Sequence, residues 1–510
     1  MAQVDTELAN SGQEATILTS EAVEFLHLLQ ARFAPCRQEL LVERDRRQHR
    51  YDLGQAPHSL PEMAHSGESG WAVKPPLSDH ALGQVMLACP PASHLMSRGV
   101  SADAVTLIAD FDNCLSPTWP NCLESHASLL KALDRGTAPA GAISVRPRNL
   151  SLEEKHFPAG GTPISASLFD FGLSIFHMAR TLPARPAVAH FSLAKLESRQ
   201  EARWWADIFR FAEQHLEIPQ GFIRVMVAID TISAASEMEE IVFELRDYIT
   251  ALECSPVSYL TSFVRSLRAH GESLLPQRSD ISMNQPFLQA YRELLVHTCL
   301  KHKIRAISSS VQQFRTQDTG SRDERGEARV SLEIQHEIEL GFDGICVADP
   351  DLVPVALSTF RKTRKRHRAI GPHLGKCHIT ARDLISPSLG GRITMPALKE
   401  NVDSALVYLE GWLAGSASGA RGLHSMASAE LCRAQLWQWL RYSARLSCGH
   451  RVSRYVIECL IRDSLAGIET RVGGAEFAAS RFPVAAEVLL NSCTDDFDSP
   501  LALRAYAHLC

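Results

Sequence analysis

The stretch from Phe191 to Asp247 reads FSLAKLESRQEARWWADIFRFAEQHLEIPQGFIRVMVAIDTISAASEMEEIVFELRD, and it decides the fold. Its apolar residues form first a short run, then a helical spacing, then a β-branched run, and then a helical spacing again. We therefore predict strand, helix, strand and helix at residues 190–195, 198–216, 222–230 and 236–249. A charged residue ends each strand, Lys195 in the first and Asp230 in the second.

The position of Asp230 has two interpretations. A carboxylate at the carboxyl end of a buried strand is where barrel enzymes place metal ligands and catalytic groups. An aspartate directly before a helix is also a common N-cap, because its side chain accepts a hydrogen bond from a free N–H group of the first turn. The pattern alone leaves both interpretations open.

Short apolar strands recur between helical segments from about residue 96 onward. Strands that alternate with helices are typical of an α/β fold with a parallel sheet. Seven strands with helices between them favour a closed (β/α)₈ TIM barrel, with one strand not located, over an open sheet. The predicted strands are residues 106–110, 142–146, 190–195, 224–230, 256–260, 306–310 and 344–349.

The two ends of the chain differ from the middle. Residues 19–47 have an amphipathic helical pattern that Thr19 or Ser20 can cap. Residues 48–80 are rich in His, Pro, Gly and Ser and are typical of a loop. From about residue 376 the strands stop. Three helices are predicted there, at residues 397–413, 427–442 and 451–466.

The composition is that of an ordinary globular protein. The 510 residues are 45% hydrophobic and 22% charged, and the net charge of −6 gives no reason to expect nucleic acid as a partner. The 13 cysteines form no CxxC pair, which is typical of reduced thiols rather than disulfides or zinc ligands. No apolar run reaches the roughly 20 residues that span a bilayer, so we expect no membrane association.

Two further features concern location and charge. The first residues lack the basic and apolar parts of a secretory signal, and the chain ends in His508-Leu509-Cys510 rather than a Ser-Lys-Leu type signal. We therefore expect a cytoplasmic rather than a peroxisomal protein. The basic run RKTRKRHR at residues 361–368 is typical of solvated surface, but it also suits nuclear import or the phosphates of a nucleotide-like cofactor.

Many segments of the chain resemble malate synthase, in its shorter A form. The resemblance covers nearly the whole chain in order and spacing. The segments that carry it are residues 18–33, 109–119, 145–156, 167–177, 201–209, 275–291, 341–354, 400–415 and 429–439. It implies a TIM barrel at residues 96–375, an N-terminal helical clasp at residues 1–95 and a C-terminal helical plug at residues 376–510.

The resemblance also implies a reaction. In malate synthase a carboxylate base removes a proton from the methyl group of acetyl-CoA, the enolate attacks glyoxylate, and the thioester is hydrolysed. Mg²⁺ polarises the glyoxylate and an arginine stabilises the enolate oxygen. The arginine of the family motif falls on Arg146, and a metal ligand of the family falls on Asp230, one methylene shorter than the glutamate it replaces.

Other positions of the family motifs are altered. The second metal ligand falls on Ser258, and the catalytic base falls on Ser425. His424, which replaces the glutamate before the base, is a weak substitute for it. Glu253 lies five residues before Ser258, so it would need a changed backbone to replace the lost ligand. A hydroxyl is a poor ligand for Mg²⁺, so we expect Mg²⁺ binding to be weakened.

Further family segments contribute candidate substrate-binding residues, which are Asp110, Asp112, Asp343 and Gly344. A glycine-rich family segment has become Ser308-Ser309-Ser310 here, which removes the close backbone approach that glycine allows. The packing motifs are kept while the positions that carry chemistry are changed. Two hypotheses follow: a diverged enzyme that takes an acyl-CoA and an oxoacid, or a non-catalytic homologue that binds a ligand or a partner subunit.

Overall fold

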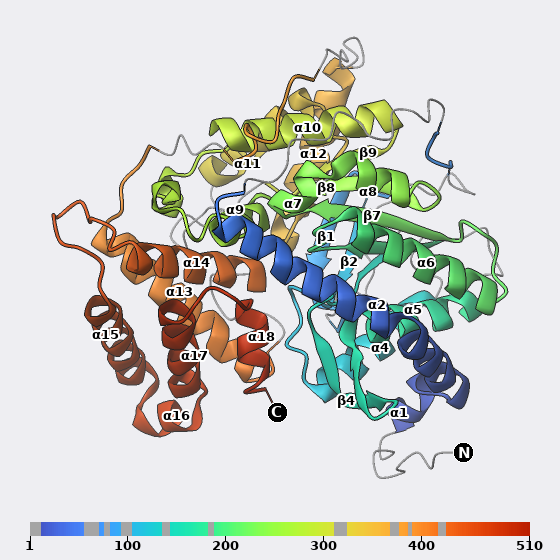
Figure 1. The fold of residues 1–510 in the computed structure, drawn as a ribbon, viewed down its shortest axis with the longest axis horizontal. Helices are drawn as coiled ribbons and strands as arrows, with labels where there is room; N and C mark the ends of the chain where they lie inside the picture. The colour runs from blue at the N-terminus through green and yellow to red at the C-terminus, as the bar shows by residue number, and fades with distance from the viewer. Residues whose placement is uncertain are drawn as a thin grey trace.

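We analysed a computed structural model of the chain. The residues that it describes are 12–55, 71–75, 82–92, 105–134, 143–181, 188–310, 324–367, 377–385, 390–416 and 425–509. Figure 1 shows a central barrel of strands, a long N-terminal helix across its front, and a group of C-terminal helices on one side.

Eight parallel strands close into a barrel in the order β1-β10-β9-β8-β7-β6-β3-β2. This confirms the predicted TIM barrel. In chain order the strands are β1 (Val85–Cys89), β2 (Val105–Asp110), β3 (Ile143–Arg146), β6 (Ala189–Leu193), β7 (Ile223–Ile229), β8 (Ile249–Cys254), β9 (Arg305–Ser308) and β10 (Gly344–Val347). A separate hairpin, β4 (Glu153–Ala159) with β5 (Thr162–Ser165), follows β3.

Six of the seven predicted strands are present, and the one at residues 256–260 is wrong. Those residues begin helix α9 (Pro256–Ser266), with proline in the first turn, where its missing N–H group costs nothing. The strand of this unit is β8, whose first residue lies at the end of the helix predicted for residues 236–249. Within that predicted span the structure has the shorter helix α8 (Met238–Glu244), and a further short helix, α7 (Ile232–Ser236), ends where the predicted helix begins.

Strand β1 corrects the predicted domain boundary. It lies within residues 1–95, which were assigned to the N-terminal clasp, yet it pairs with β2 and β10 and completes the barrel. The five residues of β1 follow the segment predicted as loop, and no helical pattern separates the two. The sequence pattern therefore did not reveal this strand. The barrel therefore begins at or before Val85.

The helices between the strands follow the usual order of a barrel. Helix α6 shows why this sequence forms them: the Ser198 side chain accepts the Glu201 N–H group at its N-terminus, and Trp204, Trp205 and Phe209 are buried on one face. Besides α7, α8 and α9, the others between the strands are α4 (Trp119–Asp134), α5 (Ala166–Thr181), α10 (Pro286–His302) and α11 (Glu324–Leu340), and α12 (Val353–His367) follows β10.

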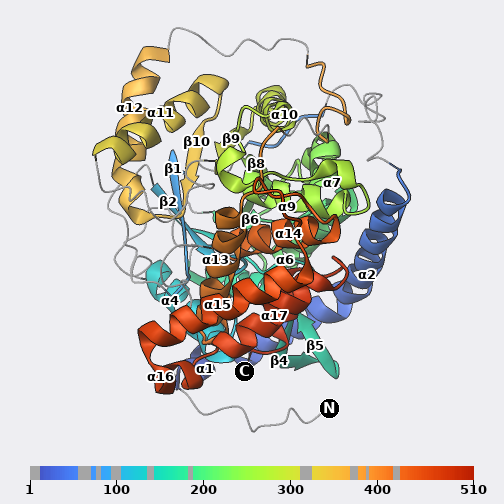
Figure 2. The ribbon, with the colours of Figure 1, turned by 90° about the vertical axis from the view of Figure 1, so that its left-hand side faces the viewer.

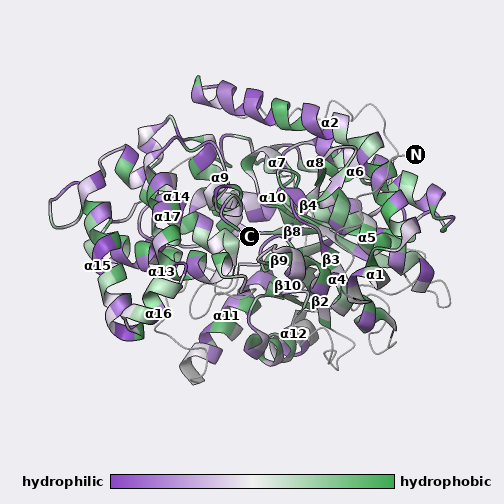
Figure 3. Cartoon of the chain, turned by 90° about the horizontal axis from the view of Figure 1, so that it is seen from below, coloured by the Kyte–Doolittle hydropathy of each residue, from purple (hydrophilic) through white to green (hydrophobic). Residues whose placement is uncertain are grey.

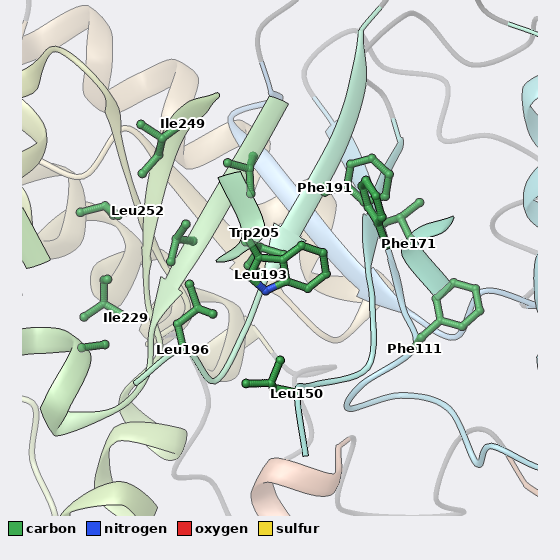
Figure 4. Packing of buried hydrophobic residues seen from close by; sticks show 14 of the residues in the cluster. Phe111, Leu150, Phe171, Phe191, Leu193, Leu196, Trp205, Ile229, Ile249 and Leu252 are labelled. Atoms are coloured by element: carbon green, nitrogen blue, oxygen red, sulfur yellow. The ribbon is translucent and has the colours of Figure 1, made fainter. Parts of the chain in front are cut away.

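The core lies between the strands and this helical layer. Figure 4 shows Phe171 of α5, Phe191 of β6 and Trp205 of α6 close together. The ring of Phe171 lies 4.9 Å from that of Phe191 and 5.6 Å from that of Trp205. Burial of such rings is a large favourable term in folding, and it fixes β6 and so the residues that follow it.

The N-terminal clasp is helix α2 (Ser20–Asp52), preceded by α1 (Gly12–Ile17). The Thr19 side chain caps α2, as the sequence predicted, and the helix continues five residues beyond the predicted end at residue 47. Figure 3 shows hydrophilic residues along much of α2, which lies at the edge of the barrel. Several of its polar side chains are nevertheless buried: Gln30, Arg37, Arg44, Arg47 and Gln48.

The C-terminal helices form a domain with its own core, as expected for the helical plug. Figure 2 shows α13, α14 and α15 in front of the barrel strands. Asn113, just past the carboxyl end of β2, accepts hydrogen bonds from Met426 N–H and Tyr408 Oη with its carbonyl oxygen. The helices therefore cover the carboxyl end of the barrel. They are α13 (Met395–Leu413), α14 (Met426–Arg441), α15 (Arg454–Val472), α16 (Gly474–Ala479), α17 (Phe482–Thr494) and α18 (Leu501–Tyr506). None of the described helices is long and apolar enough to cross a membrane.

Candidate functional site

Four charged side chains lie at the carboxyl ends of the barrel strands. Asp110 ends β2, Arg146 ends β3, Glu253 is the penultimate residue of β8, and Asp230 directly follows β7. Each is at most 6% exposed. Because the carboxyl ends of parallel strands share one rim of a barrel, these four residues meet at its mouth.

The guanidinium of Arg146 holds two of these carboxylates. Its Nη1 donates to Asp110 Oδ2 at 2.9 Å, and its Nη2 donates to Glu253 Oε2 at 2.7 Å. Ser192 Oγ accepts from its Nε at 3.1 Å, and the Ser309 hydroxyl donates to the other oxygen of Glu253. Burial disfavours the charge on Arg146, but Glu253 and then Asp110 raise its pKa well above the usual value, so it remains a cation.

A second cation, Lys195, lies in the turn between β6 and α6. Its Nζ lies 2.7 Å from Oδ2 of Asp112, while Oδ1 of Asp112 accepts the backbone and side-chain N–H groups of Asn149 at 2.9 and 2.7 Å. Burial opposes the charge on both groups. The ion pair outweighs burial, so it lowers the pKa of Asp112 and raises that of Lys195. The two side chains therefore form an ion pair near neutral pH, with the carboxylate buried and the ammonium group half-buried.

The structure excludes the N-cap interpretation of Asp230. Both of its side-chain oxygens accept the backbone N–H group of Lys195, at 2.9 and 3.0 Å, and Lys195 has a φ of 57°, in the left-handed region. The cap of α7 is instead Thr231, whose side chain accepts the N–H group of Ala234. Burial raises the pKa of Asp230 to about 7, although Lys195 lowers it and Asp112 raises it further. Asp230 is thus a buried carboxyl group at the mouth that titrates near neutral pH.

A pocket opens beside Asp230, between the barrel and the C-terminal helices. It has a volume of about 110 Å³. Ser258, in the first turn of α9, lines this pocket together with Asp230 and Lys195, so the structure brings these three sequence positions together. Residues of α2, α9, α14 and the segment before α18 complete its wall, among them Arg44, Arg265, Glu430, Arg433, Phe497 and Ser499.

Ser425 lies at the N-terminus of α14, next to this pocket. Its hydroxyl accepts the N–H group of Ser428 and caps the helix, and Oγ of Ser428 lies 3.3 Å away. The next residue, Met426, lines the pocket and donates its N–H group to the carbonyl oxygen of Asn113. The position predicted for the base is therefore near the mouth but carries a capping hydroxyl. His424 lies outside the described residues.

Asp343 and Gly344 are not part of this site. Gly344 begins β10, and Asp343 Oδ2 accepts the N–H group of Ala306 near the start of β9. The starts of parallel strands lie at the opposite end of the barrel from the mouth. The prediction that these two residues bind substrate is therefore corrected. They belong to a well-matched segment, residues 341–354, but they lie at its beginning, before or at the start of β10, and so at the bottom of the barrel.

The chain was compared with protein families, curated proteins and solved structures. It matches the malate synthase models for the N-terminal domain at residues 4–65, the TIM barrel domain at residues 142–387 and the C-terminal part at residues 392–509. Malate synthase of Streptomyces clavuligerus is 34% identical over 97% of this chain and 96% of that protein. This chain belongs to the malate synthase family.

The chain is also similar to other malate synthases. Malate synthase A of Escherichia coli is 30% identical over 95% of this chain and 94% of that protein. Among solved structures, the magnesium and glyoxylate complex of Haloferax volcanii malate synthase is 14% identical, with a TM-score of 0.45, over 82% of this chain and 99% of that one.

The sequence reasoning missed the placement of one residue at the candidate site, Glu253. The strand prediction at 256–260 placed it before the strand, whereas it lies in β8. Alternation within β8 could have located it, because Ala251 faces the barrel interior with Met226 and Ile307, and residue 253 shares its face.

The residues at the mouth fit a divalent metal poorly. Asp230 and Ser258 are the predicted ligand positions, and Asp230 already accepts a backbone N–H group with both oxygens. Within the described ranges, no group of three or more His, Cys, Asp or Glu side chains could hold a metal ion. The cations Arg146 and Lys195 pair with the other carboxylates, Asp110, Asp112 and Glu253.

The basic run at residues 361–368 lies at the end of α12. Arg361 and Lys362 are exposed, whereas Thr363 is buried. The side chains of residues 364–367 and the whole of residue 368 lie outside what the structure describes. The role of this basic run stays a prediction.

Proposed function

We propose that this chain is a diverged malate synthase homologue that binds an acyl-CoA and a small oxoacid at the barrel mouth. In the family reaction, acetyl-CoA and glyoxylate give malate and free CoA. We propose that the chain catalyses that reaction very slowly or not at all. The single observation that carries the proposal is Ser425, whose hydroxyl caps α14 where the family reaction needs a carboxylate base.

The missing base affects the first step. The methyl group next to the thioester must lose a proton so that its carbon can attack the aldehyde carbon of glyoxylate. A serine hydroxyl that is hydrogen-bonded at a helix N-terminus is far too weak a base, and general base catalysis typically contributes about 10²–10⁴-fold in rate. The Asp230 carboxyl has a pKa near 7, which suits proton transfer, but Lys195 N–H holds both of its oxygens.

The arginine supports the same proposal. In the family reaction this cation stabilises the negative charge that develops on the enolate oxygen. Here Arg146 is already paired with Asp110 and Glu253. Two carboxylates cancel most of the positive potential that an incoming oxyanion would meet, so Arg146 is expected to stabilise an enolate less.

Mg²⁺, when bound, would polarise the glyoxylate carbonyl and hold its carboxylate. Asp230 and Ser258 are the residues that would hold the ion, and we propose that they hold it weakly, because a neutral hydroxyl replaces a carboxylate. The binding role of this chain would then rest on Arg146, Lys195 and the pocket wall rather than on the metal.

The alternative is a homologue without catalytic activity that serves as a binding or partner subunit. Calorimetry separates the two: the full chain is titrated with acetyl-CoA and with glyoxylate, each with and without Mg²⁺. We expect heat of binding from acetyl-CoA, and release of free CoA thiol close to the background rate. If acetyl-CoA and other short acyl-CoA thioesters give no heat of binding, the alternative of a non-catalytic partner subunit replaces this proposal. Rapid release of CoA thiol would show that the standard reaction is intact.

A further inference from the structure

Three arginines from three helices line the pocket beside Asp230. They are Arg44 of α2, Arg265 of α9 and Arg433 of α14. Figure 1 shows the end of α2 reaching α9, and α14 next to α9. None of these residues has a role in the family reaction considered above. The presence of three arginines in the pocket wall therefore needs an explanation of its own.

Arg433 is the most constrained of the three, because it is only 1% exposed. Its Nη2 donates to Glu430 Oε1 at 2.5 Å and to the carbonyl oxygen of Ser499 at 2.8 Å. Its Cζ lies 3.8 Å from the centre of the Phe497 ring. Its Nε and Nη1 are buried and find no acceptor among the described residues. Buried N–H groups without an acceptor are rare and destabilising, so a charged guanidinium that lines a pocket in this state indicates a ligand.

The charges next to Arg265 point the same way. Glu197 lies 3.0 Å from Arg47, 3.6 Å from Arg44 and 3.8 Å from Arg265, and Arg44 also pairs with Glu201 at 2.7 Å. Glu197 is thus shared by three arginines, and Arg265 has the longest of the three contacts, so the Arg265 charge is the least closely paired of them. The Arg265 side chain is 27% exposed, so a ligand can reach it from the pocket.

We propose that this pocket contains an oxyanion subsite, in which Arg433 and Arg265 bind a carboxylate or phosphate group of a ligand. Guanidinium groups form strong, charge-assisted hydrogen bonds with both kinds of oxyanion. The carboxylate would come from an organic acid, and the phosphate from a nucleotide-like molecule. The subsite stands independently of the proposed function, because it needs neither the base nor the metal.

The test is calorimetric titration of the full chain at low ionic strength with inorganic phosphate and, separately, with succinate. The variants are Arg265→Gln and Arg433→Gln, with Arg454→Gln as the matched control, because Arg454 is an exposed arginine of α15 that pairs only with Glu458 among the described residues. We expect at least one probe to bind the parent chain and to bind Arg265→Gln about tenfold more weakly or worse, since hydrogen bonds to charged groups are strong enough for such a loss. The control should keep the parent affinity.

The outcomes separate clearly. Binding of phosphate alone assigns the subsite to a phosphate ligand, binding of succinate alone assigns it to a carboxylate, and binding of both supports the shared chemistry. The proposal is overturned if neither probe binds the parent chain. It is also overturned if Arg265→Gln and the Arg454→Gln control bind the probe with the same affinity. Should Arg433→Gln fail to fold, Arg265→Gln still decides, because its only ion pair in the described part of the chain is the 3.8 Å contact with Glu197. No titration uses acetyl-CoA or turnover, so the result does not depend on the reaction.

Discussion

Oε2 of Glu253 lies 2.7 Å from Nη2 of Arg146, inside the carboxyl end of the barrel. The two residues come from β8 and β3, which are not neighbours in the sheet, so this ion pair crosses the barrel interior. Both are buried, and in such a setting each charge depends on the other, because removing one partner leaves an uncompensated charge. Together with Asp110, Glu253 therefore limits how much positive potential Arg146 offers to a ligand.

We first predict that Glu253→Gln strengthens the binding of a small anion at the mouth. Glutamine keeps a hydrogen bond to Arg146 but removes one negative charge, so the guanidinium is less neutralised. We expect the affinity for glyoxylate to rise about tenfold, which corresponds to about 1.4 kcal/mol. Calorimetry with glyoxylate measures it.

The control for this change is Glu487→Gln, which removes an exposed carboxylate of α17. It should leave the affinity unchanged. Equal or weaker glyoxylate binding by folded Glu253→Gln would mean that Arg146 does not contact the ligand.

The second prediction concerns pH and Asp230. Burial is the main cause that raises its pKa from 3.8 to about 7. Between these two values the unfolded chain binds fewer protons at this group than the folded chain, so this group's contribution to stability falls as pH rises from about 4 to about 7. The full difference is at most about 4 kcal/mol, at 1.36 kcal/mol for each unit.

Asp230→Asn should remove this part of the pH dependence, since asparagine resembles the protonated form and can still accept the Lys195 N–H group. Urea unfolding of parent and variant at pH 5 and pH 8 gives the difference between the two proteins, in which the other titrating groups cancel. We expect the variant to gain stability relative to the parent at pH 8. A constant difference across this range would place the pKa of Asp230 near its ordinary value.

The third prediction tests the proposed loss of turnover. The double change Ser258→Asp with Ser425→Asp restores a metal ligand and a base, and it should raise the release of free CoA thiol from acetyl-CoA and glyoxylate in the presence of Mg²⁺. Each single change should recover little, because groups that act as a unit are not additive. Single changes that each restore the full effect would contradict this dependence.

The fourth prediction concerns the clasp. Arg44 of α2 donates to both oxygens of Glu201, at 2.8 and 2.7 Å, and to the carbonyl oxygen of Lys195. Arg44→Met leaves the Glu201 carboxylate buried without its cation, so we expect a loss of about 3–5 kcal/mol in the free energy of unfolding.

Arg46→Met is the control for the clasp, because the Arg46 side chain on the same helix is 69% exposed. Its cost should stay within about 0.5 kcal/mol, as for other surface substitutions. Urea denaturation measures the free energy of unfolding of both variants. Similar losses from both would mean that the contacts of Arg44 stabilise the fold no more than the exposed pair of Arg46 and Glu43 does.

Sequence reasoning predicted the fold well because the barrel units have clear periods. The stretch around Trp205 alternates strand and helix regularly, which favoured a barrel over an open sheet, and the resemblance to malate synthase pointed to the same fold. It failed at β8, where the apolar spacing of α8 runs into the strand and the real boundary depends on tertiary packing. The error moved the predicted strand past Pro256 and hid the position of Glu253.

The candidate site was predicted only in part, for a physical reason. Strand-end residues such as Asp110, Arg146 and Asp230 could be located, since a strand end is visible in the sequence. Their partners could not, because the contact between Glu253 and Arg146 joins strands more than 100 residues apart in sequence. Asp343 was misplaced for a different reason: it was taken from a matched motif, although the strand predicted at residues 344–349 already puts it at the strand start, away from the mouth.

Helix α2 has a consequence for the order in which the chain folds. Its polar side chains bind partners far along the sequence: Arg37 and the carbonyl oxygen of Leu150 are 113 positions apart, and Gln48 and the carbonyl oxygen of Arg265 are 217 apart. Such long-range contacts form slowly, because a large loop must close before they stabilise anything. During synthesis the clasp emerges first, yet it meets its last partners only after α9 has been made. We therefore expect α2 to dock late, onto a barrel that is largely assembled, and to be exposed to proteases in a nascent chain that stops before Arg265.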